Sequence, residues 1–355
     1  MKIGQSLAKG EIKMKYAKAK KKRLGLKIAA AILAIIVLFF AVMNFLPRPK
    51  NYGGENPLIK DGDMPILVAH RGGDGEFPGN TLEAFYNAYS VDKRAIMETD
   101  INLTKDGVLI LCHDTTLDGT TNVSGEISDW TYSDLISQNV NFGYDNDDDT
   151  EGLDLFKDEN GDIVYPSSLE EYPAGLPGRD SEIFLTTTLE DLLISFPETI
   201  VSIEIKQSGE VGLSAVREAL KVVEKYSAFD RVIFASFHDE IYDEYLRLDK
   251  SGEAPEGFMY SPSMGGVVTY YVLYLLGLDV FFTDGAALLQ IPPEKYGLNL
   301  ASERLIENAR SHNMATHYWT VDDPEEMRML IENGADAIMT DYPHRLKSVY
   351  DSYNQ

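Results

Sequence analysis

The feature that most constrains this fold is an alternation of short apolar runs with helical stretches after residue 64. Strand-like runs occur at residues 66–69, 96–103, 108–111, 200–206, 231–236, 257–260, 279–283, 315–319 and 336–340. Helical stretches lie between several of them, at residues 80–88, 188–196, 212–226, 302–312 and 324–333. Such alternation favours an α/β architecture, and about eight units over roughly 290 residues match a TIM (β/α)₈ barrel. An open doubly wound sheet is the alternative, but the chain has no G-x-G-x-x-G turn and no P-loop to support it.

A second feature is the N-terminal segment. Residues 28–46 are uncharged and almost entirely apolar, which is long enough for one transmembrane helix. Residues 1–27 carry ten Lys/Arg and one Glu, so we expect them to stay in the cytoplasm and the rest of the chain to face outward at the cell membrane. A cleaved signal peptide is the alternative, although no clear cleavage site precedes Pro47. Residues 47–63, with three prolines and two adjacent glycines, are interpreted as a linker to a domain at 64–355.

The charge of that outer domain restricts its partners. The net charge of −25 for the whole chain includes a +9 segment before residue 28, so the remainder holds 22 Lys/Arg and 56 Asp/Glu. An acidic domain of this kind argues against a nucleic-acid partner. Any anionic substrate must therefore be bound by a few local cations or by a metal ion.

Residues 98–114 contain the densest group of candidate functional side chains. Glu98 and Asp100 lie two apart in a strand-like run and would share one face of it. The pair Asp106-Gly107 predicts a hairpin, and a two-residue loop there would place His113 opposite Asp100. Carboxylates suit a hard divalent cation such as Ca²⁺ or Mg²⁺, and a nearby histidine is a candidate for proton transfer. A polar hairpin end exposed to water is the alternative interpretation.

Other polar residues follow the predicted strands. They are His70-Arg71, Glu204-Lys206, His238, Trp319 and Thr340-Asp341. In a (β/α)₈ barrel the carboxyl ends of the strands form the catalytic face, so these side chains are expected to surround one site.

Two segments fit this scheme less well. Residues 139–182 form a long acidic stretch, which we interpret as a solvated insertion or lid. Residues 264–278 are apolar and rich in tyrosine, which predicts a helix covering the barrel or, alternatively, a lip that rests on the membrane.

Once these residues are placed, a family resemblance becomes apparent. The relevant motifs are A-H-R-G at 69–72, N-T-L-E-A-F at 80–85, E-T-D-I-N-L-T-K-D-G at 98–107, H-D at 113–114, E-I-K at 204–206, W-T-V-D-D at 319–323 and G-A-D-A-I-M-T-D-Y-P at 334–343. In order and spacing the chain resembles the glycerophosphodiester phosphodiesterase family from residue 66 to about 350. That family consists of metal-dependent TIM barrels that cleave glycerophosphodiesters into an alcohol and glycerol 3-phosphate.

The resemblance implies a role for eight residues. Glu98, Asp100 and Glu204 would hold one divalent cation, and His70 and His113 would form an acid/base pair. Arg71 and Lys206 would contact the phosphate, and Trp319 would line the glycerol side. The family usually has P-E-N-T where this chain has P-G-N-T at 78–81, so the contribution of that glutamate is missing.

Two further functions remain open at the level of sequence. The apolar segment at 264–278 would suit a lysophospholipase D, or an enzyme acting on a polyglycerolphosphate wall polymer. A non-catalytic barrel that only binds glycerophosphate groups is a hypothesis of another class, for which the glycine at position 79 is the motivation.

Overall fold

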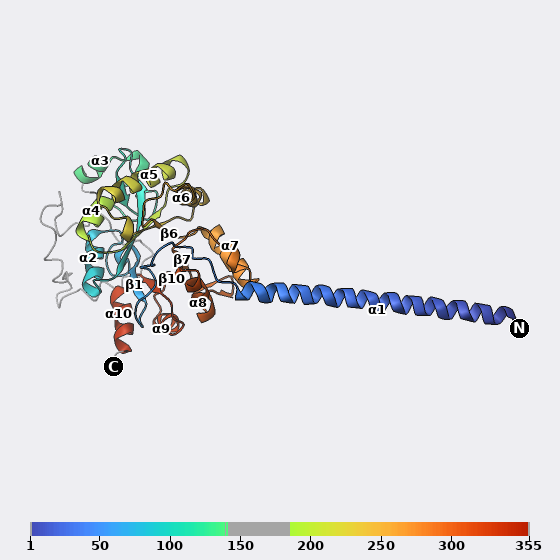
Figure 1. Ribbon diagram of the computed structural model, residues 1–355. Coiled ribbons are helices and arrows are strands. Elements are labelled where there is room, and N and C mark those ends of the chain that lie inside the picture. Colours follow the sequence, from blue (N-terminus) through green and yellow to red (C-terminus); the bar gives the residue numbers. More distant parts are fainter. Residues whose placement is uncertain (1, 139, 141–184, 354–355) are drawn as a thin grey trace. The chain divides into compact units, whose positions relative to one another are not determined.

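A computed structural model describes residues 2–138, 140 and 185–353 of the chain (Figure 1). Within them, eight parallel strands form the centre of an α/β barrel with helices around the outside. These strands are β1 (Ile66–Ala69), β2 (Ile96–Leu103), β4 (Val201–Ile205), β5 (Val232–Ala235), β6 (Met259–Tyr260), β7 (Leu288–Ile291), β10 (Ala315–Tyr318) and β11 (Ala337–Thr340). The predicted TIM-barrel class is confirmed, and the alternative of an open doubly wound sheet is wrong.

The order of the strands shows how nearly the barrel closes. Neighbouring strands pair in the order β6-β5-β4-β2-β1-β11-β10-β7. The two strands at the ends of this order are connected by a hydrogen bond from the Ala287 amide to the Tyr260 carbonyl oxygen, at 3.0 Å. Each neighbouring pair in this order is parallel, so the carboxyl ends of the eight strands face the same end of the barrel.

Short apolar strands surround an interior of buried apolar side chains. Val68, Ile96, Ile233 and Leu288 come from four different strands and are fully buried in one cluster. Leu58, from the segment interpreted as a linker, is also fully buried in that cluster. Its neighbour Asn56 donates to the carbonyl oxygens of Ala287 and Asn313 at 2.7 and 2.8 Å, so residues 56–58 are part of the barrel's packing.

Except for α1, which precedes the first strand, the helices of the described residues come after strands in the chain. They are α1 (Lys2–Phe45), α2 (Leu82–Val91), α3 (Tyr132–Ser137), α4 (Leu189–Ser195), α5 (Gly209–Lys225), α6 (Asp239–Ser251), α7 (Met264–Leu275), α8 (Glu303–Ser311), α9 (Pro324–Glu332) and α10 (Pro343–Ser352). Short 3₁₀ turns occur at His70–Gly72, Ile127–Asp129, Phe229–Arg231 and Asp279–Phe281. Two short strands, β8 (Glu294–Lys295) and β9 (Leu298–Asn299), form a separate hairpin.

The N-terminal cap of α2 is Thr81. The side chain of Thr81, not Asn80, accepts the hydrogen bond from the Ala84 amide. Asn80 lies one residue before the cap with a positive φ of 62°, a backbone region that asparagine tolerates better than most residues. In this conformation the Asn80 side chain does not cap the helix and instead contacts Asp100.

The hairpin after β2 also differs by one residue from the expected register. Its second strand, β3 (Leu109–Leu111), pairs with β2 so that Ile101 faces Leu111. Residue numbers of partners thus sum to 212, because the loop has three residues and ends at Gly107 with φ +83°. Asp100 is therefore opposite Cys112, whose amide donates to the Asp100 carbonyl oxygen at 3.0 Å, and His113 comes one residue later.

One predicted strand is wrong. Residues 279–283 contain the 3₁₀ turn Asp279–Phe281, and the barrel strand that follows α7 is β7 at Leu288–Ile291. Apolar character alone could not distinguish a turn with two buried residues, Asp279 and Phe282, from a strand. Apart from Val140, the acidic insertion predicted at 139–182 lies outside the described residues.

The described chain divides into two compact units. One consists of Met1–Pro49 with Tyr271–Phe282, and the other of Lys50–Tyr270 with Thr283–Gln355. The first unit contains α1, in which Lys20–Phe45 includes an 18-residue window with a mean hydropathy of 2.8 and is long and apolar enough to cross a membrane. By length and composition alone, this helix is compatible with a membrane span or a signal sequence.

Candidate active site

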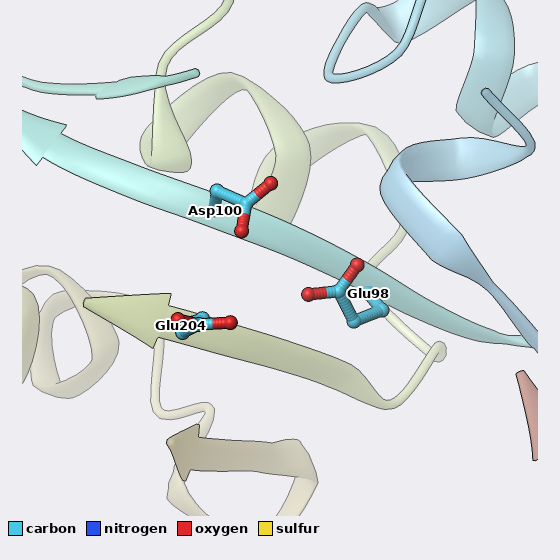
Figure 2. A group of neighbouring side chains, drawn as sticks. All are labelled: Glu98, Asp100 and Glu204. Carbon is cyan, nitrogen blue, oxygen red and sulfur yellow. The ribbon is translucent and has the colours of Figure 1, made fainter. Parts of the chain in front are cut away.

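Three carboxylates converge at the carboxyl ends of two neighbouring strands. Glu98 and Asp100 alternate along β2 and share a face, as predicted from their spacing, and the register pairs Asp100 with Glu204 of β4. Figure 2 shows the three carboxylate groups on the same side of these strands. One potential ligand atom from each lies within 4.8 Å of the others. This is an all-oxygen donor set of the kind that hard divalent cations prefer.

Two basic side chains contact this cluster. The Lys206 Nζ atom lies 3.0 Å from Glu204 Oε1 and 3.4 Å from Asp100 Oδ1. The Arg71 Nε atom lies 3.3 Å from Asp100 Oδ2, and the Arg71 amide donates to Glu98 Oε2 at 3.0 Å. Three acidic groups therefore face two fixed cations, which leaves an excess negative charge beside groups suited to an anionic substrate.

Asn80 is a member of the site that sequence reasoning missed. Its buried side chain donates to Asp100 Oδ2 at 3.1 Å and accepts from the Thr99 hydroxyl at 2.7 Å. It also accepts from the Asp100 amide at 3.2 Å. Asn80 thus fixes the carboxylate of Asp100, and no local sequence pattern connects these two residues, which are 20 positions apart.

His70 is held by a carboxylate from the C-terminal part of the chain. Its Nδ1 atom lies 2.6 Å from Asp341 Oδ1, and its Nε2 atom lies 4.0 Å from Glu98 Oε2. Asp341 is itself positioned by Asp322, whose Oδ1 accepts from the Asp341 amide at 2.9 Å and from the Thr340 hydroxyl at 2.7 Å. Burial lowers the pKa of His70, but the hydrogen bond and charge of Asp341 and the charge of Glu98 outweigh it and raise the pKa to about 9.

His113 follows β3 and is the more accessible of the two predicted histidines. Its side chain is 39% exposed, and its Nδ1 atom lies 2.9 Å from Asp114 Oδ1. Partial burial lowers its pKa, and the negative charge of Asp100 partly offsets that effect. The charge of Asp100 therefore acts on both predicted histidines.

Trp319 and His238 complete the group of residues after the strands. The Trp319 ring packs edge to face against Phe237, with centroids 5.7 Å apart, and these residues follow β10 and β5. His238 Nε2 is 2.9 Å from the Lys206 carbonyl oxygen, so this histidine has a structural partner. Of the eight predicted site residues, six form one connected set of contacts: Glu98, Asp100, Glu204, Lys206, Arg71 and His70.

The electrostatics of the cluster fit a bound cation. Burial, and then the charge of Asp100, raise the pKa of Glu98 to about 7. Burial also raises the pKa of Glu204, whereas the pKa of Asp100 is lowered because Lys206 and Arg71 outweigh its burial. Glu98 and Glu204, crowded beside Asp100, therefore resist ionisation, and a divalent cation would remove that penalty.

The loop before α2 explains the glycine at position 79. Asp74 accepts from the Gly79 amide at 2.8 Å and from the Arg71 guanidinium at 2.8 Å. A Cβ atom on residue 79 would lie only 2.2 Å from Asp74 Oδ1. The absence of a side chain at Gly79 therefore gives room to a carboxylate that holds Arg71.

Comparisons with known proteins identify the family to which the chain belongs. Residues 70–345 match the glycerophosphoryl diester phosphodiesterase family. The chain is 26% identical over 341 residues to a glycerophosphodiester phosphodiesterase of Bacillus subtilis, covering 90% of this chain and 98% of that protein. It is 28% identical over 284 residues to a glycerophosphodiester phosphodiesterase of Caldanaerobacter subterraneus, covering 79% of this chain and 96% of that protein.

Solved structures share the fold. A phosphodiesterase of Oleispira antarctica, solved in complex with the product sn-glycerol-3-phosphate, superposes with a TM-score of 0.57 at 19% identity, covering 81% of this chain and 97% of that one. A glycerophosphoryl diester phosphodiesterase domain from Mycobacterium tuberculosis superposes with a TM-score of 0.58 at 19% identity, covering 80% of this chain and 98% of that one.

Fold and site together define a barrel hydrolase of phosphoric diesters. The chain belongs to the glycerophosphoryl diester phosphodiesterase family, as the motifs predicted, and it is an enzyme with glycerophosphodiester phosphodiesterase activity.

Proposed function

We propose that this enzyme uses one divalent cation and two histidines to hydrolyse glycerophosphodiesters to an alcohol and glycerol 3-phosphate. The observation that supports this most directly is the convergence of ligand atoms from Glu98, Asp100 and Glu204 within 4.8 Å of one another. These residues would hold Ca²⁺ or Mg²⁺, and the bound ion would supply positive charge to the phosphoryl oxygens.

Arg71 and Lys206 bind the phosphate in this proposal. Both cations are already fixed by carboxylates, at 2.8 Å between Arg71 and Asp74 and at 3.0 Å between Lys206 and Glu204. Fixed donors stabilise developing charge without reorganising during the reaction. Trp319 lines the glycerol side of the same face.

His70 and His113 transfer the protons. One deprotonates the nucleophile, which is a water molecule or the 2-hydroxyl of the glycerol, and the other protonates the leaving alkoxide. The contact between His70 Nδ1 and Asp341, at 2.6 Å, leaves Nε2 on the side of Glu98. Asp341 therefore orients the ring, as the third group of a triad does.

We further propose that α1 anchors the enzyme in the cell membrane. The mean hydropathy of Lys20–Phe45 and the basic cluster at its start support this orientation, with residues 1–27 inside and the barrel outside. The substrates are then small or lipid-derived phosphodiesters outside the cytoplasm.

The catalytic proposal is tested with the full chain in detergent micelles and glycerophosphocholine as substrate. Activity should require a divalent cation, and His113→Ala should lower kcat by about 10²–10⁴, the usual contribution of a general acid or base. His344→Ala is a matched control, because the side chains of His344 and His113 are both 39% exposed but His344 contacts Glu76. Full activity in excess chelator, or equal losses in the two variants, would contradict the proposal.

A second candidate activity is that of a lysophospholipase D. It is favoured by the 23% identity, over 308 residues, to a mouse protein named lysophospholipase D. Comparing the rates on glycerophosphocholine and on micellar lysophosphatidylcholine would distinguish the two activities. A polyglycerolphosphate polymer would be a third substrate in the same assay.

A further inference from the structure

The apolar segment Tyr271–Phe282 belongs to the same compact unit as the N-terminal helix. It contains the last turn of α7, a left-handed residue at Gly277 (φ +66°) and the 3₁₀ turn Asp279–Phe281. Neither the barrel nor the catalytic site explains why a domain with 56 acidic residues should contain so apolar a stretch.

A buried ion pair joins this segment to the end of α1. Arg48 Nε lies 2.5 Å from Asp279 Oδ2, and the second guanidinium nitrogen donates to Asp279 Oδ1 at 3.2 Å. The same arginine donates to the carbonyl oxygens of Met43 and Leu46 at 3.1 and 2.8 Å, which caps the C-terminal end of the helix. Asp279 is only 1% exposed, and a charge so buried is stable only with a well-placed partner.

A close backbone approach adds to this connection. A Cβ atom on Gly277 would lie 3.2 Å from the Asn44 side chain, so the absence of a side chain at Gly277 lets the segment approach the last turn of α1. Asn44 itself is fixed by a hydrogen bond to the Phe40 carbonyl oxygen at 2.8 Å. The segment is therefore held at the point where the apolar helix ends.

The side chains that the segment leaves exposed are apolar. Val272 is 47%, Leu275 61%, Leu276 52% and Phe281 60% exposed. Asp279 is the only charged residue between Met264 and Phe282, and Arg48 neutralises it. Solvent-facing side chains of this kind in one short segment mark an interaction surface.

The position of this surface relative to the bilayer follows from the number of residues between it and the apolar run of α1. Arg48 is two residues beyond Leu46, the last residue of the apolar run. At no more than ~3.6 Å per residue, it lies within about 7 Å of the end of that run. The interfacial layer of a bilayer extends roughly 5–8 Å beyond the hydrocarbon core on each side, so a segment fixed to Arg48 falls in this layer. Tyr271 and Tyr274 are typical of such a layer, where an aromatic ring with a polar end is favoured.

We propose that Tyr271–Phe282 is a second membrane contact, which lies in the interfacial layer of the outer leaflet with Val272, Leu275, Leu276 and Phe281 facing the lipid. The partner is the lipid bilayer into which α1 inserts, and this inference rests on the proposed anchor. An uncharged contact is the kind that an acidic enzyme can make with an anionic lipid surface, since acidic patches would be repelled. The Arg48–Asp279 pair holds the segment beside the C-terminal end of α1.

The test uses the full chain in vesicles of phosphatidylethanolamine and phosphatidylglycerol. Cys112 is the single cysteine and is buried, so Cys112→Ala gives a background for one introduced cysteine. Val272→Cys is compared with Val211→Cys on α5, because these valines are similarly exposed, at 47% and 42%. Each is labelled with an environment-sensitive fluorophore and checked for activity on glycerophosphocholine, which shows that the labelled chain is folded.

The expected result is that the label at position 272 is several-fold less accessible to aqueous iodide than the label at 211, and is quenched by a bromine-labelled lipid chain. If the protein floats with the vesicles but both labels are equally open to iodide, the anchor stands and the second contact is refuted. If the protein does not float after a high-salt wash, the anchor itself fails and the inference fails with it. Disulfide dimers of Val272→Cys at high lipid-to-protein ratio would also refute it, in favour of a second copy as the partner.

Discussion

The contact between Asp341 and His70 makes a quantitative prediction for the cation-free protein. Asp341→Asn keeps an oxygen that can accept from His70 Nδ1 but removes the negative charge 2.6 Å from it. Burial then dominates, and the pKa of His70 should fall from about 9 to its ordinary value near 6.5 or below. Because a tenfold change in proton affinity is worth ~1.4 kcal/mol, the free energy at stake is on the order of 3 kcal/mol.

The pH dependence of stability follows from the difference in the pKa of His70 between the folded and unfolded states. In the wild-type protein the pKa of His70 is higher in the folded than in the unfolded state. The stabilisation is therefore fully present below pH 6.5 and is lost as the pH rises toward about 9. In Asp341→Asn this loss should be absent. The free energy of unfolding should be larger for the wild type than for the variant below pH 6.5. This difference should shrink as the pH rises from 6.5 to about 9.

The assay is urea unfolding of chelator-treated full-length protein in detergent micelles between pH 6 and 10, together with an NMR titration of the His70 ring. Asp114→Asn is the control, because Asp114 contacts His113 at 2.9 Å and not His70. The reasoning is refuted if His70 titrates at the same pH in the wild type and in Asp341→Asn. With the cation restored, Asp341→Asn should also lower kcat/KM, by up to about 10⁴, the loss seen when the orienting aspartate of a triad is replaced.

Four further predictions concern the site and its support. Glu204→Gln should weaken cation binding at least ~10-fold in calorimetric titration of the chelator-treated protein, since it removes one of three carboxylate ligands; unchanged affinity would exclude it as a ligand. Asn80→Ala should cost about 1–3 kcal/mol in urea unfolding, because buried groups around Asp100 lose their partner. Gly79→Glu should reduce activity, since its Cβ would lie 2.2 Å from Asp74 Oδ1, and adding Asp74→Gly should restore part of it; a double variant no better than the single one would contradict this steric account. Leu58→Ala should destabilise the barrel by about 2–5 kcal/mol in the same unfolding assay, and no loss would show that residues before 64 are dispensable.

Local patterns in the sequence were sufficient for much of the fold. Largely apolar runs of four to seven residues predicted β1, β4, β5, β10 and β11 within a residue or two, because strands buried in a parallel barrel are apolar on both faces. The spacing of Glu98 and Asp100 predicted a shared face, and this holds in β2. Where the local signal was ambiguous, prediction was wrong: residues 279–283 are a turn, and the Asp106-Gly107 hairpin has a three-residue loop.

Within the site, the sequence determined which chemistry is possible: three acids, two bases and two imidazoles, each beside a strand end. Only the tertiary structure decided how they are paired. Asp341 is 271 positions from His70 in the sequence and Asn80 is 20 from Asp100, and no periodicity connects residues so placed. The physical reason is that closing a barrel brings strand ends together in space according to strand order, so β1 lies between β2 and β11 although β11 is the last strand of the chain.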